Sequence, residues 1–194
     1  MAYCNKRLIL ASGSPRRREL LDKFGINYEI LPAQGEESAP PELTPGERVK
    51  ALAAQKAEEV AQRLNDPAAV ILAADTLVEL DGEVLGKPRD REDAAGMLRR
   101  LSGRRHTVVS GVTLRTTGRM HSFEARTSVW FRPLADEEIA YYVDAFRPFD
   151  KAGSYGIQEW IGYAAIERIE GSFYNVMGLP VQKVYTELDK FLNP

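Results

Sequence analysis

The stretch LILASGSPRRRELL, residues 8–21, decides how the fold begins, because an apolar run breaks there at a turn and continues as a helix. The run at residues 8–10 predicts a strand, and Pro15 suits the first position of the helix. Ser14 is a good N-cap, and the unpaired N–H groups of a first helical turn favour an anion. The stretch therefore predicts a phosphate site at the start of this helix.

Two arginines, Arg16 and Arg17, lie in the first turn of the predicted helix. Cations there are mildly unfavourable against the helix dipole, so a helix with only a structural role more often carries Asp or Glu. Each guanidinium group can bind two phosphate oxygens at once, and Gly13 lets the backbone approach a ligand. These features favour a binding site over a purely structural helix end.

The composition is that of an ordinary globular domain, and we expect a single domain over residues 1–194. Its 26 Lys and Arg against 28 Asp and Glu give a net charge of −2, without the basic excess of general nucleic-acid binders. No apolar run approaches the roughly 18 residues of a membrane span, so we expect a cytoplasmic protein. Cys4 is the one cysteine, and we expect His106 and His121 in strands rather than in a metal site.

The order of patterns predicts an α/β fold with a mixed, partly antiparallel central sheet, flanked by helices, in two lobes around a cleft. Turns at Asp81-Gly82 and Thr117-Gly118 predict hairpins, and a capping box at 44–47 predicts the start of a helix. Helices are expected at 15–24, 44–64, 90–101, 136–146 and 181–192, and strands at 8–10, 26–30, 69–75, 76–80, 83–86, 106–117, 120–131, 164–169 and 173–176, with Lys87 just past the strand at 83–86.

Two polar residues interrupt the apolar patterns. Lys56 stands in the apolar stripe of the helix at 44–64, where a lysine usually has an anionic partner. The alternative is a side chain that extends along the helix surface to solvent. The strand at 69–75 ends in Asp75, and ligands bind at the carboxyl ends of such strands, so Asp75 and its neighbour Thr76 are site candidates.

Together the candidates have the composition of a site for a triphosphate with a divalent metal. Carboxylates hold Mg²⁺ or Mn²⁺, while lysines and arginines neutralise the remaining phosphate charge. The four cations and two carboxylates in question are Arg16, Arg17, Lys56, Lys87, Glu37 and Asp75.

The chain resembles the Maf family of nucleoside triphosphate pyrophosphatases over nearly its whole length. The segment DKAGSYGIQ is most similar to the subgroup acting on dTTP and UTP, rather than the one preferring a methylated guanine nucleotide. The motifs, in the family's order, are ASGSPRR at 11–17, AQKA at 54–57, AADT at 73–76, GEVLGKP at 82–88, MLRRLSGRRH at 97–106, DKAGSYGIQ at 150–158 and VMGLP at 176–180.

The resemblance implies a Maf or inosine-triphosphatase-like fold, a homodimer, and hydrolysis of the α–β phosphoanhydride to a monophosphate and pyrophosphate, with Mg²⁺ or Mn²⁺. It implies that Asp75 is the proton acceptor and a metal ligand, and that Glu37, or its neighbour Glu36, is the second acid and metal ligand. Lys56 and Lys87 would contact the phosphates. The residues implied for substrate binding and choice are Ser12, Ser14, Arg16, Arg17, Thr76 and Gln158.

Gln158 also suits a base by its own chemistry, because one amide offers both a donor and an acceptor to a uracil or thymine edge. The alternative is an amide that the loop backbone satisfies. Glu159 and Trp160 depart from the family, which commonly has a small residue after the glutamine. This departure bears on base preference and not on the reaction.

Two other functions remain open from the sequence. One is a methylated-GTP pyrophosphatase of the same family, and the other is a regulator of cell division that binds nucleotides without turnover. A binder has little use for Asp75 beside Glu37 among phosphates, because their repulsion would lower affinity. The acids therefore favour the enzyme.

Overall fold

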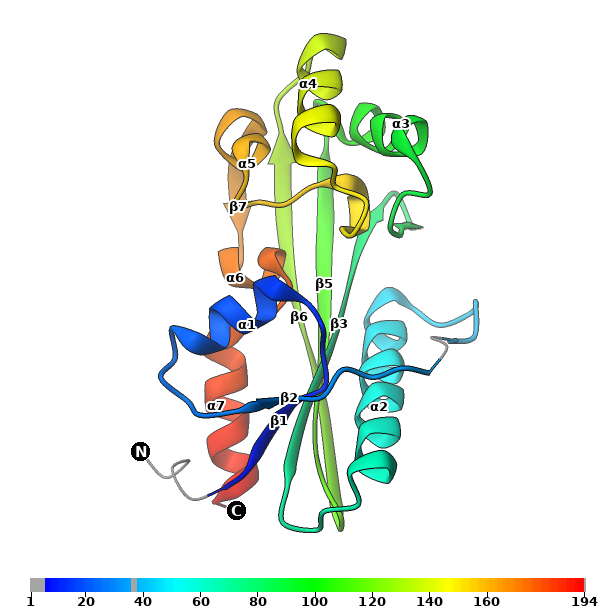
Figure 1. Cartoon of the computed structure of the whole chain (residues 1–194). Helices are drawn as coiled ribbons and strands as arrows, with labels where there is room; N and C mark the ends of the chain where they lie inside the picture. The colour runs from blue at the N-terminus through cyan, green and yellow to red at the C-terminus, as the bar shows by residue number, and fades with distance from the viewer. Residues whose placement is uncertain (1–5, 36–37, 194) are drawn as a thin grey trace. The chain divides into compact units, whose positions relative to one another are not determined.

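The computed structural model describes residues 6–35 and 38–193, which form an α/β fold around one mixed sheet (Figure 1). The strands are β1 (Leu8–Leu10), β2 (Glu29–Ile30), β3 (Val70–Leu80), β4 (Glu83–Leu85), β5 (Arg105–Thr116), β6 (Arg119–Phe131) and β7 (Ile166–Glu170). The helices are α1 (Pro15–Asp22), α2 (Pro45–Leu64), α3 (Arg91–Leu101), α4 (Asp136–Phe146), α5 (Trp160–Ala165), α6 (Phe173–Met177) and α7 (Val181–Leu192), and η2 (Ala152–Ser154) is a short 3₁₀ turn.

The sheet has seven strands in the order β2-β1-β3-β5-β6-β7, with β4 paired to β3 off this path. β1 is parallel to β2 and β3, whereas β4 is antiparallel to β3 and β7 to β6. This confirms the predicted mixed sheet flanked by helices. The hairpin at Asp81-Gly82 is also confirmed, and both residues have the positive φ, 52° and 83°, that its tight turn requires.

The chain divides into two compact units. Unit 1 comprises Met1–Asp75, Ser110–Ala125 and Gly178–Pro194, and unit 2 comprises Thr76–Val109 and Arg126–Met177. The boundary falls inside β3, β5 and β6, so each of these strands contributes residues to both units.

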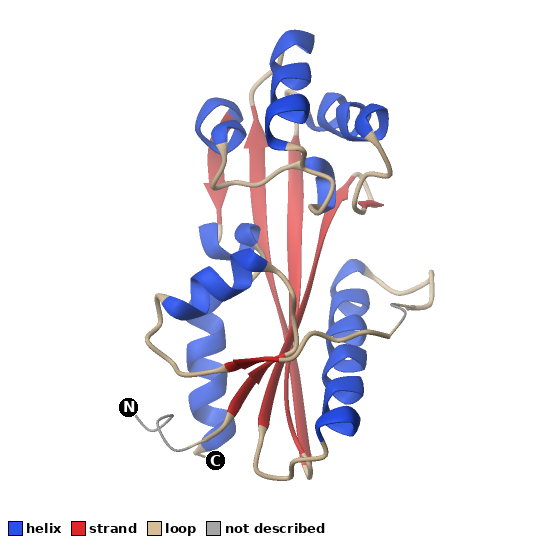
Figure 2. Cartoon of the chain, viewed as in Figure 1, coloured by secondary structure: helices blue, strands red, loops and turns tan. Residues whose placement is uncertain are grey.

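In unit 1, α2 and α7 flank the strands on two sides (Figure 2). The predicted capping box starts α2: Thr44 Oγ1 accepts the Glu47 N–H, and the Glu47 carboxylate accepts the Thr44 N–H at 3.0 Å. A hydrophobic core cluster lies between α2 and the sheet, and several of its members are alanines, which let the helix approach closely. The members of the cluster are Ile9, Ala11, Ala57, Val60, Ala69, Ile71 and Ala73.

In unit 2, α3 packs against α4 and η2. Asp90 caps α3 as expected, accepting the Asp93 N–H at 2.8 Å. His106, Phe131 and Tyr155 form an edge-to-face aromatic cluster with ring centroids 5.0–5.4 Å apart. His106 and His121 both lie in strands, as predicted.

The strand predicted at 173–176 is wrong, because these residues form α6. The Ser172 hydroxyl accepts the Asn175 N–H at 3.3 Å, which closes the first turn of the helix. The Asn175 amide is buried and donates to the Val108 carbonyl at 3.1 Å and to Thr127 Oγ1 at 3.0 Å. The strand predicted at 164–169 is partly right, since α5 extends to Ala165 before β7 begins.

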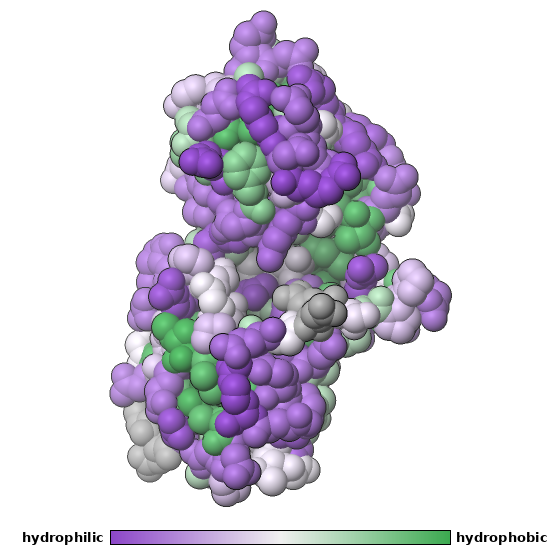
Figure 3. Space-filling view, turned by 45° about the vertical axis from the view of Figure 1, so that its right-hand side comes forward, coloured by the Kyte–Doolittle hydropathy of each residue, from purple (hydrophilic) through white to green (hydrophobic). Residues whose placement is uncertain are grey.

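The face shown in Figure 3 is mostly hydrophilic, with separate hydrophobic patches. Within the described ranges, no helix has the length and apolar character to cross a membrane.

Gly111 of β5 lies against α2, and its replacement provides a test of this packing. A Cβ at Gly111 would lie 2.4 Å from the Val49 carbonyl carbon, so the backbone of α2 would have to move. We expect Gly111→Ala to lower the free energy of unfolding by about 1–3 kcal/mol, as overpacked cores do. Urea denaturation measures the change.

Gly96 provides the matched control, because it lies in α3 with no heavy atom within 4 Å of an added Cβ. Gly96→Ala is expected to raise stability by roughly 0.5–1 kcal/mol, through helix propensity. Equal effects of the two alanines would contradict the close approach of β5 and α2.

Candidate active site

Lys56 and Asp75 form the central ion pair of unit 1. Lys56 Nζ lies 2.6 Å from Asp75 Oδ1, and their side chains are 11% and 14% exposed. The sequence predicts an anionic partner for Lys56 in the apolar stripe of α2, and that partner is Asp75 of β3. Two largely buried charges have been removed from most of their water, so each depends on the other.

Asp75 does not end a strand, which corrects one detail of the sequence analysis. β3 runs unbroken from Val70 to Leu80, because the apolar alternation continues through residues 77–80. The parallel pairing with β1 nevertheless stops at Leu72, with one further bond from the Ala11 N–H to the Leu72 carbonyl. Asp75 therefore follows the parallel part of β3, next to where β1 gives way to the loop before α1.

Arg17 fastens that loop to two other segments of unit 1. Its Nε donates to the Gly178 carbonyl at 2.8 Å, and its Nη1 donates to the Ala74 carbonyl at 2.9 Å and to Ser12 Oγ at 3.1 Å. Three hydrogen bonds from this guanidinium group therefore go to protein acceptors. This favours a role in positioning the loop over binding two phosphate oxygens at once. The sequence carries no signal for these acceptors, since two of them are backbone carbonyls.

The start of α1 is built as predicted, with one difference. Ser14 is the N-cap and Pro15 follows it, but the Ser14 side chain makes no capping bond to the helix. The Ser14 N–H instead donates to Ser12 Oγ at 3.3 Å. A Cβ at Gly13 would meet only Pro32, at an ordinary 3.8 Å, so local packing does not require glycine there. Arg16 lies in the first turn of α1.

Glu37 and its alternative Glu36 lie outside the described residues. Two nearby backbone N–H groups, one before and one after them in the chain, are hydrogen-bonded to α2. The Gln34 N–H donates to Glu59 Oε2 and the Ser38 N–H to Gln55 Oε1, both at 3.3 Å. Both acceptors lie on the helix that carries Lys56, within a turn of it.

The other predicted site residues belong to unit 2. Thr76 directly follows Asp75 in β3, and Lys87 is exposed just after β4. Gln158 lies before α5, and its Oε1 is buried with no hydrogen-bond partner in the part of the chain that the structure describes. The segments of Lys87 and Gln158 are linked, because the Gly153 N–H donates to the Gly86 carbonyl at 3.0 Å.

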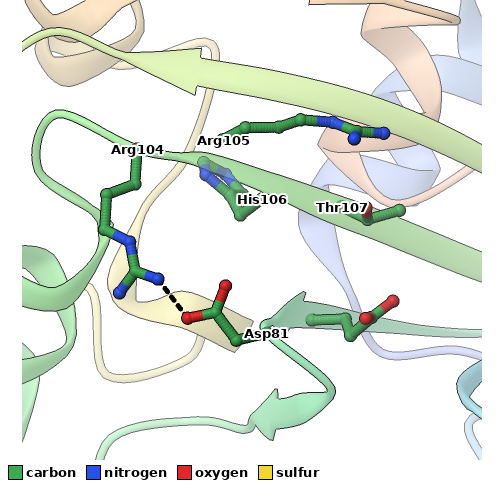
Figure 4. A pocket seen from close by; sticks show the side chains of 6 residues that line it. Asp81, Arg104, Arg105, His106 and Thr107 are labelled. Atoms are coloured by element: carbon green, nitrogen blue, oxygen red, sulfur yellow. Dashed lines mark hydrogen bonds and ion pairs between the residues drawn. The ribbon is translucent and has the colours of Figure 1, made fainter.

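A cavity of about 600 Å³ lies elsewhere in unit 2 (Figure 4). Asp81 and Arg104 form an ion pair at its wall, and its lining carries as many carboxylates as guanidinium groups. None of the predicted site residues lines it, so we assign it no role in substrate binding. The lining residues are Glu79, Asp81, Arg104, Arg105, His106 and Thr107.

The carboxylates of the described residues could bind a divalent cation only together with other ligands. Among residues 6–35 and 38–193, no group of three or more His, Cys, Asp or Glu side chains could hold a metal ion. Asp75 offers one carboxylate, of which Oδ1 accepts from Lys56. Mg²⁺ is commonly held by one or two carboxylates together with substrate phosphates. Asp75 fits a cation of that kind, and not a metal centre made entirely of these side chains.

A comparison with known families identifies the chain. The family model described as Maf-like protein matches residues 7–191. The chain belongs to the Maf family. The match covers both units of the structure and every helix and strand of the Maf fold described above, apart from the last residue of α7.

Similar proteins of this family carry a specific name. The "dTTP/UTP pyrophosphatase" of Phocaeicola vulgatus is 49% identical over 184 residues, which cover 95% of each chain. The protein of the same name from Bacteroides thetaiotaomicron is 50% identical over 186 residues, again covering 95% of each. Among solved structures, the Staphylococcus aureus Ham1 protein has a TM-score of 0.48 and 19% identity, covering 68% of this chain and 73% of that chain.

His106 links stability to pH in this Maf protein. The side chain is buried, with Nε2 2.7 Å from the Tyr155 hydroxyl oxygen, and burial lowers the pKa of His106 to about 3. An unfolded histidine titrates near 6.5, so below that pH the unfolded chain binds a proton that the folded chain refuses. The contribution of the neutral, buried His106 to the free energy of unfolding is therefore complete above pH 6.5 and is lost as the pH falls towards 3.

We therefore expect unfolding free energies measured in urea to fall more steeply between pH 6 and pH 4 for the wild type than for His106→Gln. The difference in slope should approach about 1.4 kcal/mol per pH unit, the value for one proton. Parallel curves for the two proteins would show that His106 does not carry this dependence.

Proposed function

We propose that this chain hydrolyses dTTP and UTP to the nucleoside monophosphate and pyrophosphate. The Lys56–Asp75 pair, 2.6 Å apart and next to the loop that starts α1, is the observation that carries the proposal. Relatives with 49–50% identity over 95% of the chain are named for this activity, which gives the substrate class. We also propose, from the sequence, a homodimer and a cytoplasmic location.

Asp75 would act as the proton acceptor. A water molecule attacks the α-phosphorus, the new oxygen–phosphorus bond forms, and the water proton moves to the Asp75 carboxylate. The bond from the α-phosphorus to the bridging oxygen breaks, and pyrophosphate leaves with that electron pair. The ammonium of Lys56 donates to Oδ1 of Asp75 and so fixes the orientation of the carboxylate. The other carboxylate oxygen, Oδ2, would accept the proton.

The start of α1 would bind phosphate. Its first N–H groups and Arg16 offer positive charge, and Ser12 and Ser14 offer hydroxyl groups to phosphate oxygens. Arg17 keeps this loop fixed against Ala74, one residue before Asp75. Lys87 would add a phosphate contact, and Thr76 and Gln158 would select the base.

A bound Mg²⁺ or Mn²⁺, held by Asp75 and Glu37, would neutralise phosphate charge and make pyrophosphate a better leaving group. The role of Glu37 rests on the sequence alone.

A substrate panel tests the proposal. The purified protein is incubated with dTTP, UTP, CTP, GTP and methylated GTP, with Mg²⁺ or Mn²⁺ or with EDTA, and the products are identified. We expect monophosphate and pyrophosphate from dTTP and UTP, and none in EDTA. Turnover of methylated GTP alone would assign the other Maf subgroup, and binding without turnover would indicate a regulator.

We predict that Asp75→Asn lowers kcat on dTTP about 10²–10⁴-fold, because the amide cannot accept the proton. Initial rates by pyrophosphate release measure this effect. Glu58→Gln is the matched control, since it removes an ion pair, to Arg115, from the same helix as Lys56. Full activity of Asp75→Asn would exclude it as the proton acceptor.

A further inference from the structure

A buried charged network lies beside Gln158 in unit 2. Lys151 is 7% exposed, and its Nζ lies 2.8 Å from Asp150 Oδ1 and 3.1 Å from Glu159 Oε1. The other carboxylate oxygen of Glu159 accepts a hydrogen bond from the Tyr142 hydroxyl. The Tyr142 oxygen in turn accepts the Gly156 N–H at 3.0 Å. Glu159 thereby joins both ends of the segment 150–159 to α4.

Each member of this network depends on the others. Tyr142 is fully buried, and burial together with the Glu159 carboxylate raises the pKa of its hydroxyl, which stays protonated and donates. Lys151 needs a carboxylate partner because an unpaired ammonium is costly away from water. The mechanism proposed above uses none of these side chains.

The network also constrains Gln158. A Cβ at Gly156 would lie 2.9 Å from Glu159 Cδ and 3.1 Å from Gln158 Nε2, so both side chains fold back over this glycine. The Glu159 N–H also donates to the Gly156 carbonyl at 3.0 Å. Oε1 of Gln158 is buried and has no hydrogen-bond partner among the described residues, and its Nε2 lies over Gly156, so the packing around Glu159 restricts rotation of the amide.

We propose that Tyr142, Lys151 and Glu159 are positioning residues that make the protein prefer uracil and thymine nucleotides over cytosine nucleotides. Uracil and thymine offer an N3–H donor beside the O4 acceptor, whereas cytosine offers an N3 acceptor beside an amino donor. An amide in one fixed orientation matches only one of these patterns, while an amide free to rotate matches both. This inference rests on the proposed function, in which Gln158 reads the base.

Two variants loosen the network by different routes. Glu159→Gln keeps the size of the side chain and removes the charge that pairs with Lys151. Tyr142→Phe keeps the ring and removes the hydroxyl that holds Glu159 and the Gly156 N–H. Glu137→Gln is the matched control, since Glu137 is an exposed carboxylate on the same helix as Tyr142.

We expect both variants to lower the preference for UTP over CTP in kcat/KM by roughly 10-fold, the worth of about one hydrogen bond. The change should fall on KM, with kcat for UTP close to that of the wild type, because Asp75 and Lys56 are untouched. Glu137→Gln should keep the wild-type preference. Thermal unfolding measures how much of each variant is folded.

Folded variants that keep the wild-type preference would overturn the proposal, even if their Tm is lower, because a structural role alone predicts that result. The dissociation constants of UTP and CTP in EDTA provide the same comparison without turnover. A wild type that hydrolyses neither nucleotide would therefore overturn the proposed function, while the ratio of these constants still decides the positioning role.

Discussion

The pairing of Lys56 with Asp75 is the constraint on which the rest of unit 1 depends. Two charges that are each less than one-sixth exposed are tolerated only if α2 and β3 hold them within hydrogen-bond distance. The buried side chains between α2 and the sheet, the close approach at Gly111 and the capping box that starts α2 all help to place this helix against the strands.

Arg17 holds together the segments that contain the proposed phosphate-binding and proton-accepting residues. Ser12, Ala74 and Gly178 are far apart in the chain, and one guanidinium group binds all three. Its planar fork provides several donors in fixed directions, which a lysine could not supply. The loop before α1 and the residue preceding Asp75 are thus held by the same side chain. Arg17 therefore positions both the proposed phosphate-binding loop and the segment of the proposed proton acceptor.

Much of this arrangement could be predicted from the sequence, and the exceptions have physical reasons. Turn residues and capping boxes act locally, so the hairpins and the starts of α2 and α3 were predictable, as was an anionic partner for Lys56. The helix at Phe173–Met177 was not, because its stability comes from distant acceptors of the Asn175 amide. The network around Glu159 was missed because Tyr142 fits the apolar stripe of α4, and periodicity does not show where a hydroxyl group points.

The segment that carries Gln158 is attached to the hairpin before Lys87 through main-chain atoms, from the Gly153 N–H to the Gly86 carbonyl. The main-chain N–H and C=O groups are the same in every amino acid except proline, which lacks the N–H, and Gly153 needs to stay glycine because its φ is +67° and Val78 lies against it. Substitutions elsewhere in the segment, such as the glutamate at position 159, can therefore accumulate over evolution without breaking this attachment. A change in the side chains proposed here to contact the base would therefore leave this attachment in place.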